Sequence, residues 1–150
     1  MNRKGFTLVE LIVVIAIIGI LAAILVPSMM GYVKKSKLKS ANSNAKLVYT
    51  TVNGAAADII SDGVSISDIV GHGPATVKSL DGATNKLQAA VYKAMSDNGD
   101  NAGYVYWVIG TNKNITLAQW ASSNAAGDIV GQYPNPETDP DNGHTIGTSF

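Results

Sequence analysis

One apolar run limits what this chain can fold into. From Phe6 to Val26 there are 21 residues with a single ionisable side chain, Glu10, and from Leu11 to Val26 no side chain is polar. About 20 apolar residues in an α-helix cross the hydrocarbon core of a bilayer. In a chain of 150 residues, this run predicts one membrane-spanning helix joined to a single small domain.

The remaining composition excludes several classes of site. The chain has no cysteine, which removes disulfides, thiolate metal sites and cysteine nucleophiles. Its two histidines, His72 and His144, lie far apart in the sequence, so neither a metal cluster nor a catalytic triad is visible. Acidic and basic residues balance at 11 each, which gives no electrostatic reason to bind nucleic acid. We therefore expect neither an enzyme nor a cofactor.

Glu10 is the unusual residue of the apolar run. An ionised side chain within hydrocarbon costs roughly 2.5–3.5 kcal/mol on insertion scales, so such a residue is by default a functional one with a partner. The alternative is that Glu10, as the fifth residue of the run, lies at the level of the lipid headgroups. In that case its position alone would explain why it is tolerated.

The flanking charges leave the orientation of the span open. Arg3 and Lys4 precede the run, as in a secretory signal peptide, but Ala22-Ala23 leads into further apolar residues rather than into a polar mature start. Four lysines follow the run, and by the positive-inside rule they favour the orientation opposite to an extracellular head. These are Lys34, Lys35, Lys37 and Lys39.

The first 35 residues resemble the type IV prepilins. The stretch Arg-Lys-Gly-Phe-Thr-Leu-Val-Glu at residues 3–10 is similar to their processing motif, and the apolar run that ends before Pro27 is similar to their conserved helix. The resemblance is specific because it combines a basic leader, Gly5 before Phe6, an acid four residues after Phe6, and a proline after the run. The short leader is similar to that of the type IVa group.

The resemblance implies a processing and assembly pathway. A prepilin peptidase would cut between Gly5 and Phe6 and methylate the new amine of Phe6. Glu10 would pair with the terminal amine of a neighbouring subunit. The implied partners are further copies of the chain, the peptidase, an assembly platform protein and an assembly ATPase. The precursor would be a single-pass protein of the cytoplasmic membrane, and the product an extracellular filament of the kind used for adhesion and twitching motility.

Elementary electrostatics agrees with this pairing. Cleavage would create an ammonium group on Phe6, and in a helix Glu10 would lie one turn away on the same face. Buried ion pairs add little net stability but fix register well, which suits a filament. Pairing within one subunit would compete with pairing between subunits, and the sequence leaves both open.

One long helix is predicted from Thr7 to Ser61, ended by Asp62-Gly63. Gly19 and Pro27 are its points of flexibility: proline removes a backbone bond, so we expect a kink near residues 23–27, either as a plain kink or as a segment that loosens during assembly. Beyond Pro27 apolar residues recur at three- and four-residue steps, as in an amphipathic helix. These are Val33, Leu38, Ala41, Ala45, Val48, Val52, Ala55 and Ile59.

The predicted fold class is α+β. We divide the chain into a leader at residues 1–5, a hydrophobic transmembrane and assembly helix at 6–27, its amphipathic continuation at 28–62, and a globular head at 63–150. In the head, segment 64–82 is predicted to be mainly loop and residues 84–96 a short helix. Strands are predicted at 104–109, 115–120 and 128–133, which form a roughly three-stranded antiparallel sheet against the long helix.

The tail at residues 134–150 is predicted to be irregular. It holds three of the five prolines, and it lacks the cysteines with which many pilins close this region, so its anchoring is unexplained. Glu137, Asp139, Asp141 and Asn142 match part of a calcium loop, but the full ligand spacing is absent and calcium is not favoured. The lysines at 34–39 are either a solvated face or a contact with phospholipid headgroups.

The leading hypothesis is a structural subunit of a type IV pilus. A minor pilin, or a pseudopilin of a type II secretion or DNA-uptake machine, would have a similar first 35 residues. A hypothesis of a different class is an extracellular binding domain held by an uncleaved membrane anchor. That protein would show no cut at Gly5 and no dependence on Glu10.

Overall fold

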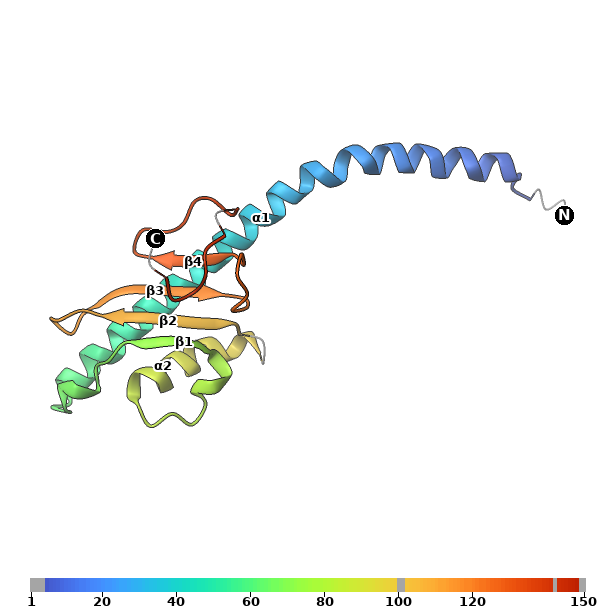
Figure 1. The fold of residues 1–150 in the computed structure, drawn as a ribbon. Helices are drawn as coiled ribbons and strands as arrows, with labels where there is room; N and C mark the ends of the chain where they lie inside the picture. The colour runs from blue at the N-terminus through green and yellow to red at the C-terminus, as the bar shows by residue number, and fades with distance from the viewer. Residues whose placement is uncertain (1–4, 100–101, 142, 149–150) are drawn as a thin grey trace. The chain divides into compact units, whose positions relative to one another are not determined.

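Figure 1 shows a computed structural model of the chain, which describes residues 5–99, 102–141 and 143–148. The chain divides into two compact units, Met1–Lys34 and Lys35–Phe150. Residues 1–4 of the expected leader, Asn142 of the acidic cluster and the last two residues of the tail lie outside the described residues.

The first unit is helical, and its apolar side chains are exposed. Helix α1, Leu8–Ser61, includes an 18-residue stretch with a mean hydropathy of 3.2, none of it buried. Every residue from Gly5 to Val33 is exposed. By length and composition α1 is the one described helix apolar enough to cross a membrane. An apolar surface of this kind needs lipid or other protein chains as its surroundings.

The second unit is built on the rest of α1. Seven residues at three- and four-residue steps are buried, which confirms the amphipathic pattern. Two details differ from the expectation: Val33 is exposed, and Ala56 is buried while Ala55 is half-buried. The buried residues are Leu38, Ala41, Ala45, Val48, Val52, Ala56 and Ile59. The helix ends where predicted: Gly63 adopts a φ of 65°, and the Val64 N–H donates to the Ile59 carbonyl.

The sheet has four antiparallel strands in the order β1-β2-β3-β4, one more than predicted. Strands β2 (Tyr104–Ile109), β3 (Ile115–Ala121) and β4 (Val130–Tyr133) correspond to the expected ones. Strand β1, His72–Thr76, comes from the segment expected to be mainly loop. Its sequence, His-Gly-Pro-Ala-Thr, lacks β-branched alternation, and Pro74 is tolerated because β1 is an edge strand.

The shorter helices connect α1 to the sheet. Helix α2, Lys86–Met95, corresponds to the predicted short helix and begins after Asn85, whose side-chain oxygen accepts from the Leu87 and Gln88 N–H groups. Three short 3₁₀ helices lie before and after α2: η1 (Ile66–Asp68), η2 (Val77–Leu80) and η3 (Ser96–Asn98). The fold class is α+β, as predicted.

Both faces of the sheet are covered. One face contributes Val105, Trp107 and Ala118 to the main core, together with the apolar side of α2 and four residues of the α1 stripe, Val48, Val52, Ala56 and Ile59. The opposite face forms a second, smaller cluster in which Ala121 and Val130 pack with Ile146 of the tail. The tail therefore completes the fold by covering a face that would otherwise expose apolar side chains.

A glycine of β4 lies directly against the backbone of α1. A Cβ placed on Gly131 of β4 would lie 2.0 Å from the Ala41 carbonyl carbon and 2.3 Å from the Asn42 nitrogen. Both of these are backbone atoms of α1, which cannot swing aside as a flexible side chain could. Glycine at position 131 therefore sets how closely β4 can lie on the helix.

Gly131→Ala is expected to destabilise the head by about 3 kcal/mol or more, because the added methyl group collides with the α1 backbone. Urea unfolding of the full chain in detergent, followed by tryptophan fluorescence, measures the effect. Gly54→Ala is the matched control, since a Cβ at Gly54 meets nothing within 4 Å and alanine favours a helix. Equal stability of the two variants would contradict the packing explanation.

Candidate assembly site

The residues of the expected cleavage site precede the helix. Gly5, Phe6 and Thr7 lie outside regular secondary structure, and α1 begins at Leu8. Phe6 is 89% exposed, and a Cβ at Gly5 would meet nothing within 4 Å. The Gly5–Phe6 peptide bond is therefore in an open, non-helical segment.

Glu10 is held by the residue that caps the helix. Its carboxylate oxygen Oε2 accepts a hydrogen bond from the Thr7 N–H at 2.8 Å and another from the Thr7 hydroxyl at 2.7 Å. In return, the Glu10 N–H donates to Thr7 Oγ1 at 3.3 Å. This reciprocal arrangement is a capping box, in which the first and fourth residues of Thr-Leu-Val-Glu satisfy each other's backbone donors.

The capping box changes how the site is understood. Both bonds from Thr7 go to Oε2, and Oε1 accepts none from the described residues. Phe6 lies before the first helical residue, so the helical spacing assumed for Phe6 and Glu10 does not hold here. The sequence pattern led us to expect Thr7 as the first helical residue and assigned its side chain no role, although a threonine three residues before a glutamate at the start of an apolar helix is the signal of a capping box.

The two expected points of flexibility lie within an unbroken helix. Helix α1 continues through both Gly19 and Pro27. Pro27 has no N–H, so the Ala23 carbonyl loses its usual helical donor. The neighbouring Ser28 hydroxyl donates to the Leu25 carbonyl at 2.8 Å. Any loosening of this segment remains a prediction.

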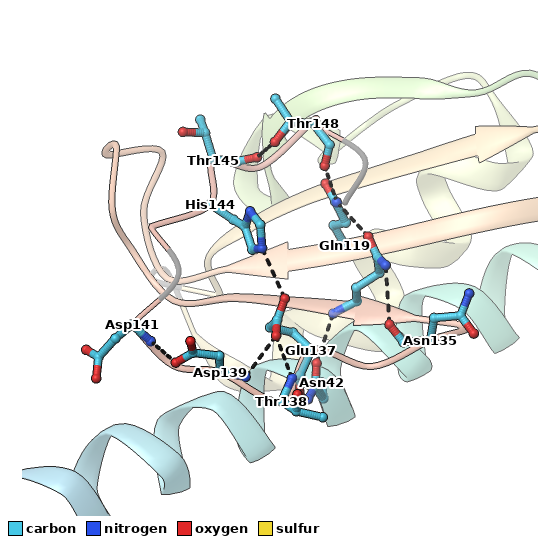
Figure 2. Close-up of polar contacts among 11 residues, drawn as sticks. Asn42, Gln119, Asn135, Glu137, Thr138, Asp139, Asp141, His144, Thr145 and Thr148 are labelled. Atoms are coloured by element: carbon cyan, nitrogen blue, oxygen red, sulfur yellow. Dashed lines mark hydrogen bonds and ion pairs between the residues drawn. The ribbon is translucent and has the colours of Figure 1, made fainter.

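The tail is fixed by a buried glutamine rather than by a disulfide. Gln119 of β3 is fully buried, and its amide nitrogen donates to the Thr148 carbonyl at 2.6 Å and to Gln132 Oε1 at 3.0 Å. Its amide oxygen accepts from the Gly147 N–H at 2.8 Å. Figure 2 shows this amide between β4 and the end of the tail. It joins the tail to the sheet by contacts with the backbone of Gly147 and Thr148.

A second amide joins the start of the tail to α1. Asn42 accepts from the Gln132 N–H at 3.0 Å and donates to the Glu137 carbonyl at 2.8 Å. The Gln132 side chain in turn donates to the Asn135 carbonyl at 3.3 Å. Helix, strand and tail are thus connected by amide groups within the head (Figure 2).

The acidic residues of the tail organise the tail itself. The Glu137 carboxylate accepts from the Asp139 N–H at 2.8 Å, from the Thr138 N–H at 2.7 Å, and lies 3.1 Å from His144 Nε2. The Asp139 N–H bond lowers the pKa of Glu137; burial opposes this, and the Thr138 N–H and His144 lower the pKa further. Among the described residues, no group of three or more acidic, histidine or cysteine side chains is placed to hold a metal.

Comparisons with known proteins identify similar chains. Residues 1–26 match the family model described as the prokaryotic N-terminal methylation motif. The chain is 31% identical over 121 residues to the type IV major alpha-pilin of Moraxella bovis, covering 78% of this chain and 75% of that one. It is also 51% identical over 49 residues to the type IV major pilin protein PilA of Myxococcus xanthus, and 41% identical over 85 residues to a fimbrial protein of Moraxella nonliquefaciens.

The extent of these matches differs. The second match covers 33% of this chain and the third 50%, and the chain spans 22% of the Myxococcus xanthus protein and 54% of the Moraxella nonliquefaciens protein, less than two thirds of either. No solved structure matches the chain.

The tail is expected to loosen in acid. The pKa of Glu137 is lower in the folded chain than the ordinary value of 4.5, so its ionised form adds stability above pH 4.5 that is lost as the pH falls through the lowered pKa. Amide hydrogen exchange of residues 138–148 between pH 6 and pH 3, corrected for intrinsic rates, measures this loss. Glu137→Gln removes the carboxylate and should flatten that part of the pH dependence; an unchanged profile would contradict it.

Proposed function

The chain belongs to the type IV pilin family, and from that premise we propose that it is the repeating subunit of an extracellular type IV pilus, matured by a prepilin peptidase. Pilins are structural proteins without enzymatic activity. The exposed apolar half of α1 supports the proposal most directly. An apolar helix surface of this size is unfavourable in water, so it has to be surrounded by lipid or by other copies of the chain.

Maturation would remove residues 1–5. The open conformation of the Gly5–Phe6 bond supports cleavage there, since a peptidase binds an extended substrate segment and Gly5 has no side chain in the way. Methylation of the new Phe6 amine would keep its positive charge. The precursor would reside in the cytoplasmic membrane as a single-pass protein, and a platform protein and an ATPase would extract it during assembly.

Assembly would use the oxygen of Glu10 that the capping box leaves open. With Oε2 bound by Thr7, Oε1 is available to the Phe6 ammonium of a neighbouring copy. Thr7 would hold the carboxylate in one orientation before the neighbour arrives, which reduces the entropy lost on pairing. The ion pair would then fix the axial offset between copies, while the apolar helix surfaces supply most of the attraction.

The names of the relatives favour a filament subunit over the other members of the class. The Moraxella bovis and Myxococcus xanthus proteins are described as major pilins. A minor pilin or a secretion pseudopilin would carry the same processing motif, and abundance on the cell surface separates them from a major pilin.

Processing can be tested by intact mass. Protein recovered from the cell exterior is expected to lack residues 1–5 and to carry one additional methyl group on Phe6. Gly5→Leu should leave the precursor uncut, because a branched side chain occupies the position before the scissile bond. Surface protein that retains residues 1–5 would contradict the proposal, as would complete trimming of the Gly5→Leu chain.

Register can be tested at Glu10. Glu10→Ala should insert into the membrane normally but lower filament yield by about tenfold or more, because the buried ammonium of Phe6 is left without its partner. Sheared filaments, quantified against total membrane-bound subunit, give the yield. Asp58→Ala is the control, since Asp58 is an exposed acid of the same helix. Equal yields from the two variants would exclude Glu10 as the register residue.

A further inference from the structure

Three lysines on the first turns of α1 in the head unit have no partner in the described part of the chain. Lys35, Lys37 and Lys39 are exposed, and none of them takes part in an ion pair or hydrogen bond with the described residues. They are called the lysine collar below. Successive helical residues are about 100° apart, so the three cations point in at least two directions from the helix.

The surroundings leave the charge of the collar in place. Helix α1 has no acidic residue between Glu10 and Asp58. The nearest acids of the head are already engaged: Asp128 accepts from the hydroxyls of Ser122 and Ser123 and from two backbone N–H groups, and Glu137 is bound within the tail as described above. These bonds come from neutral donors and leave both carboxylates negatively charged, so three lysines face two carboxylates and a net positive charge remains for an external anion.

Two hollows lie beside the collar. One has a volume of about 260 Å³ and is lined by Lys37, Trp120, Asp128 and Ile129, among others. The other, of about 250 Å³, is lined by Lys35, Lys39, Asn42, Glu137 and Thr138, among others. Ammonium, amide and hydroxyl donors beside apolar side chains suit a phosphate group that is attached to a lipid.

We propose that the lysine collar binds the phosphate groups of anionic phospholipids while the subunit is stored in the membrane. This rests on the proposed function, because it requires the apolar part of α1 to span a bilayer. The exposed apolar stretch ends at Val33, two residues before Lys35. In a helix that spans a bilayer, the residues just after the apolar stretch lie in the headgroup layer. Each lysine there strengthens binding to an anionic surface about fivefold.

The collar would set the depth of the stored subunit. Its contacts hold the head against the membrane face and are lost when the subunit is extracted into the filament. The free energy needed to break these lysine–phosphate contacts falls as salt screens the charges. By the positive-inside rule, these lysines favour the orientation opposite to an extracellular head. The proposal gives them a role that explains their position: they bind lipid once the span is inserted.

Electron spin resonance of spin-labelled lipids tests the proposal on the full chain. The chain is reconstituted in phosphatidylcholine vesicles that contain a trace of spin-labelled phosphatidylglycerol or phosphatidylcholine. The fraction of motionally restricted label gives the relative association of the two lipids. Wild type should prefer phosphatidylglycerol by about fivefold or more at low salt, falling towards no preference at about 1 M salt.

The variant Lys35→Gln/Lys37→Gln/Lys39→Gln should lose at least about two thirds of that preference. The matched control, Lys78→Gln/Lys86→Gln/Lys93→Gln, removes the same charge from η2 and α2 and should retain it. Arg3, Lys4 and Lys34 are present in every variant, so a preference that survives in the first variant does not belong to the collar and overturns the proposal. Circular dichroism confirms that each variant is folded.

Two further results would also overturn it. One is a wild type without lipid preference. The other is a preference that vanishes as the protein-to-lipid ratio rises, since the collar would then pair with acids of a second copy instead of with lipid. Either result leaves the intact mass of the surface protein unchanged, so failure here is distinguishable from failure of the proposed function.

Discussion

The structure depends on one helix that meets two environments along its length. Up to Val33 every side chain of α1 is exposed and nearly all are apolar, and from Leu38 onward one narrow stripe is buried against the sheet and α2. Ala41 of this stripe lies against Gly131 of β4. Because both residues are small, the backbones of the helix and the strand approach each other without intervening side chains. Small residues there allow β4 to lie on the helix, and the rest of the head is built outward from that contact.

The tail illustrates how the head of this chain is closed without a disulfide. A disulfide restricts the unfolded chain, whereas the buried amide of Gln119 acts in the folded state by binding the backbone on both sides of residue 147. Such a network is favourable when every member is satisfied, and no buried side-chain polar atom in the described residues lacks a partner. Glu137 binds within the same tail, and its lowered pKa leads us to expect a closure that weakens in acid, which a disulfide would not.

At the other end of the chain, Glu10 has a structural role in the helix start and, in our proposal, an intermolecular one. The capping box with Thr7 completes the first turn of α1, because each residue satisfies a backbone donor of the other. The same geometry leaves one oxygen for a cation from outside. The lysine collar at the far end of the apolar stretch would serve the stored subunit as Glu10 serves the assembled one.

The sequence by itself determined the long helix, its division into an apolar and an amphipathic part, its end at Ser61, strands β2, β3 and β4 and the family, because periodicity and apolar run length are local properties of the chain. Tertiary structure alone decided the rest. Strand β1 exists because β2 offers an open edge to His72–Thr76, which has little β-propensity of its own. Likewise, the anchoring of the tail joins Gln119 to residues 28 and 29 positions away. No local pattern encodes such contacts, since they form only after the sheet has placed both partners on the same face.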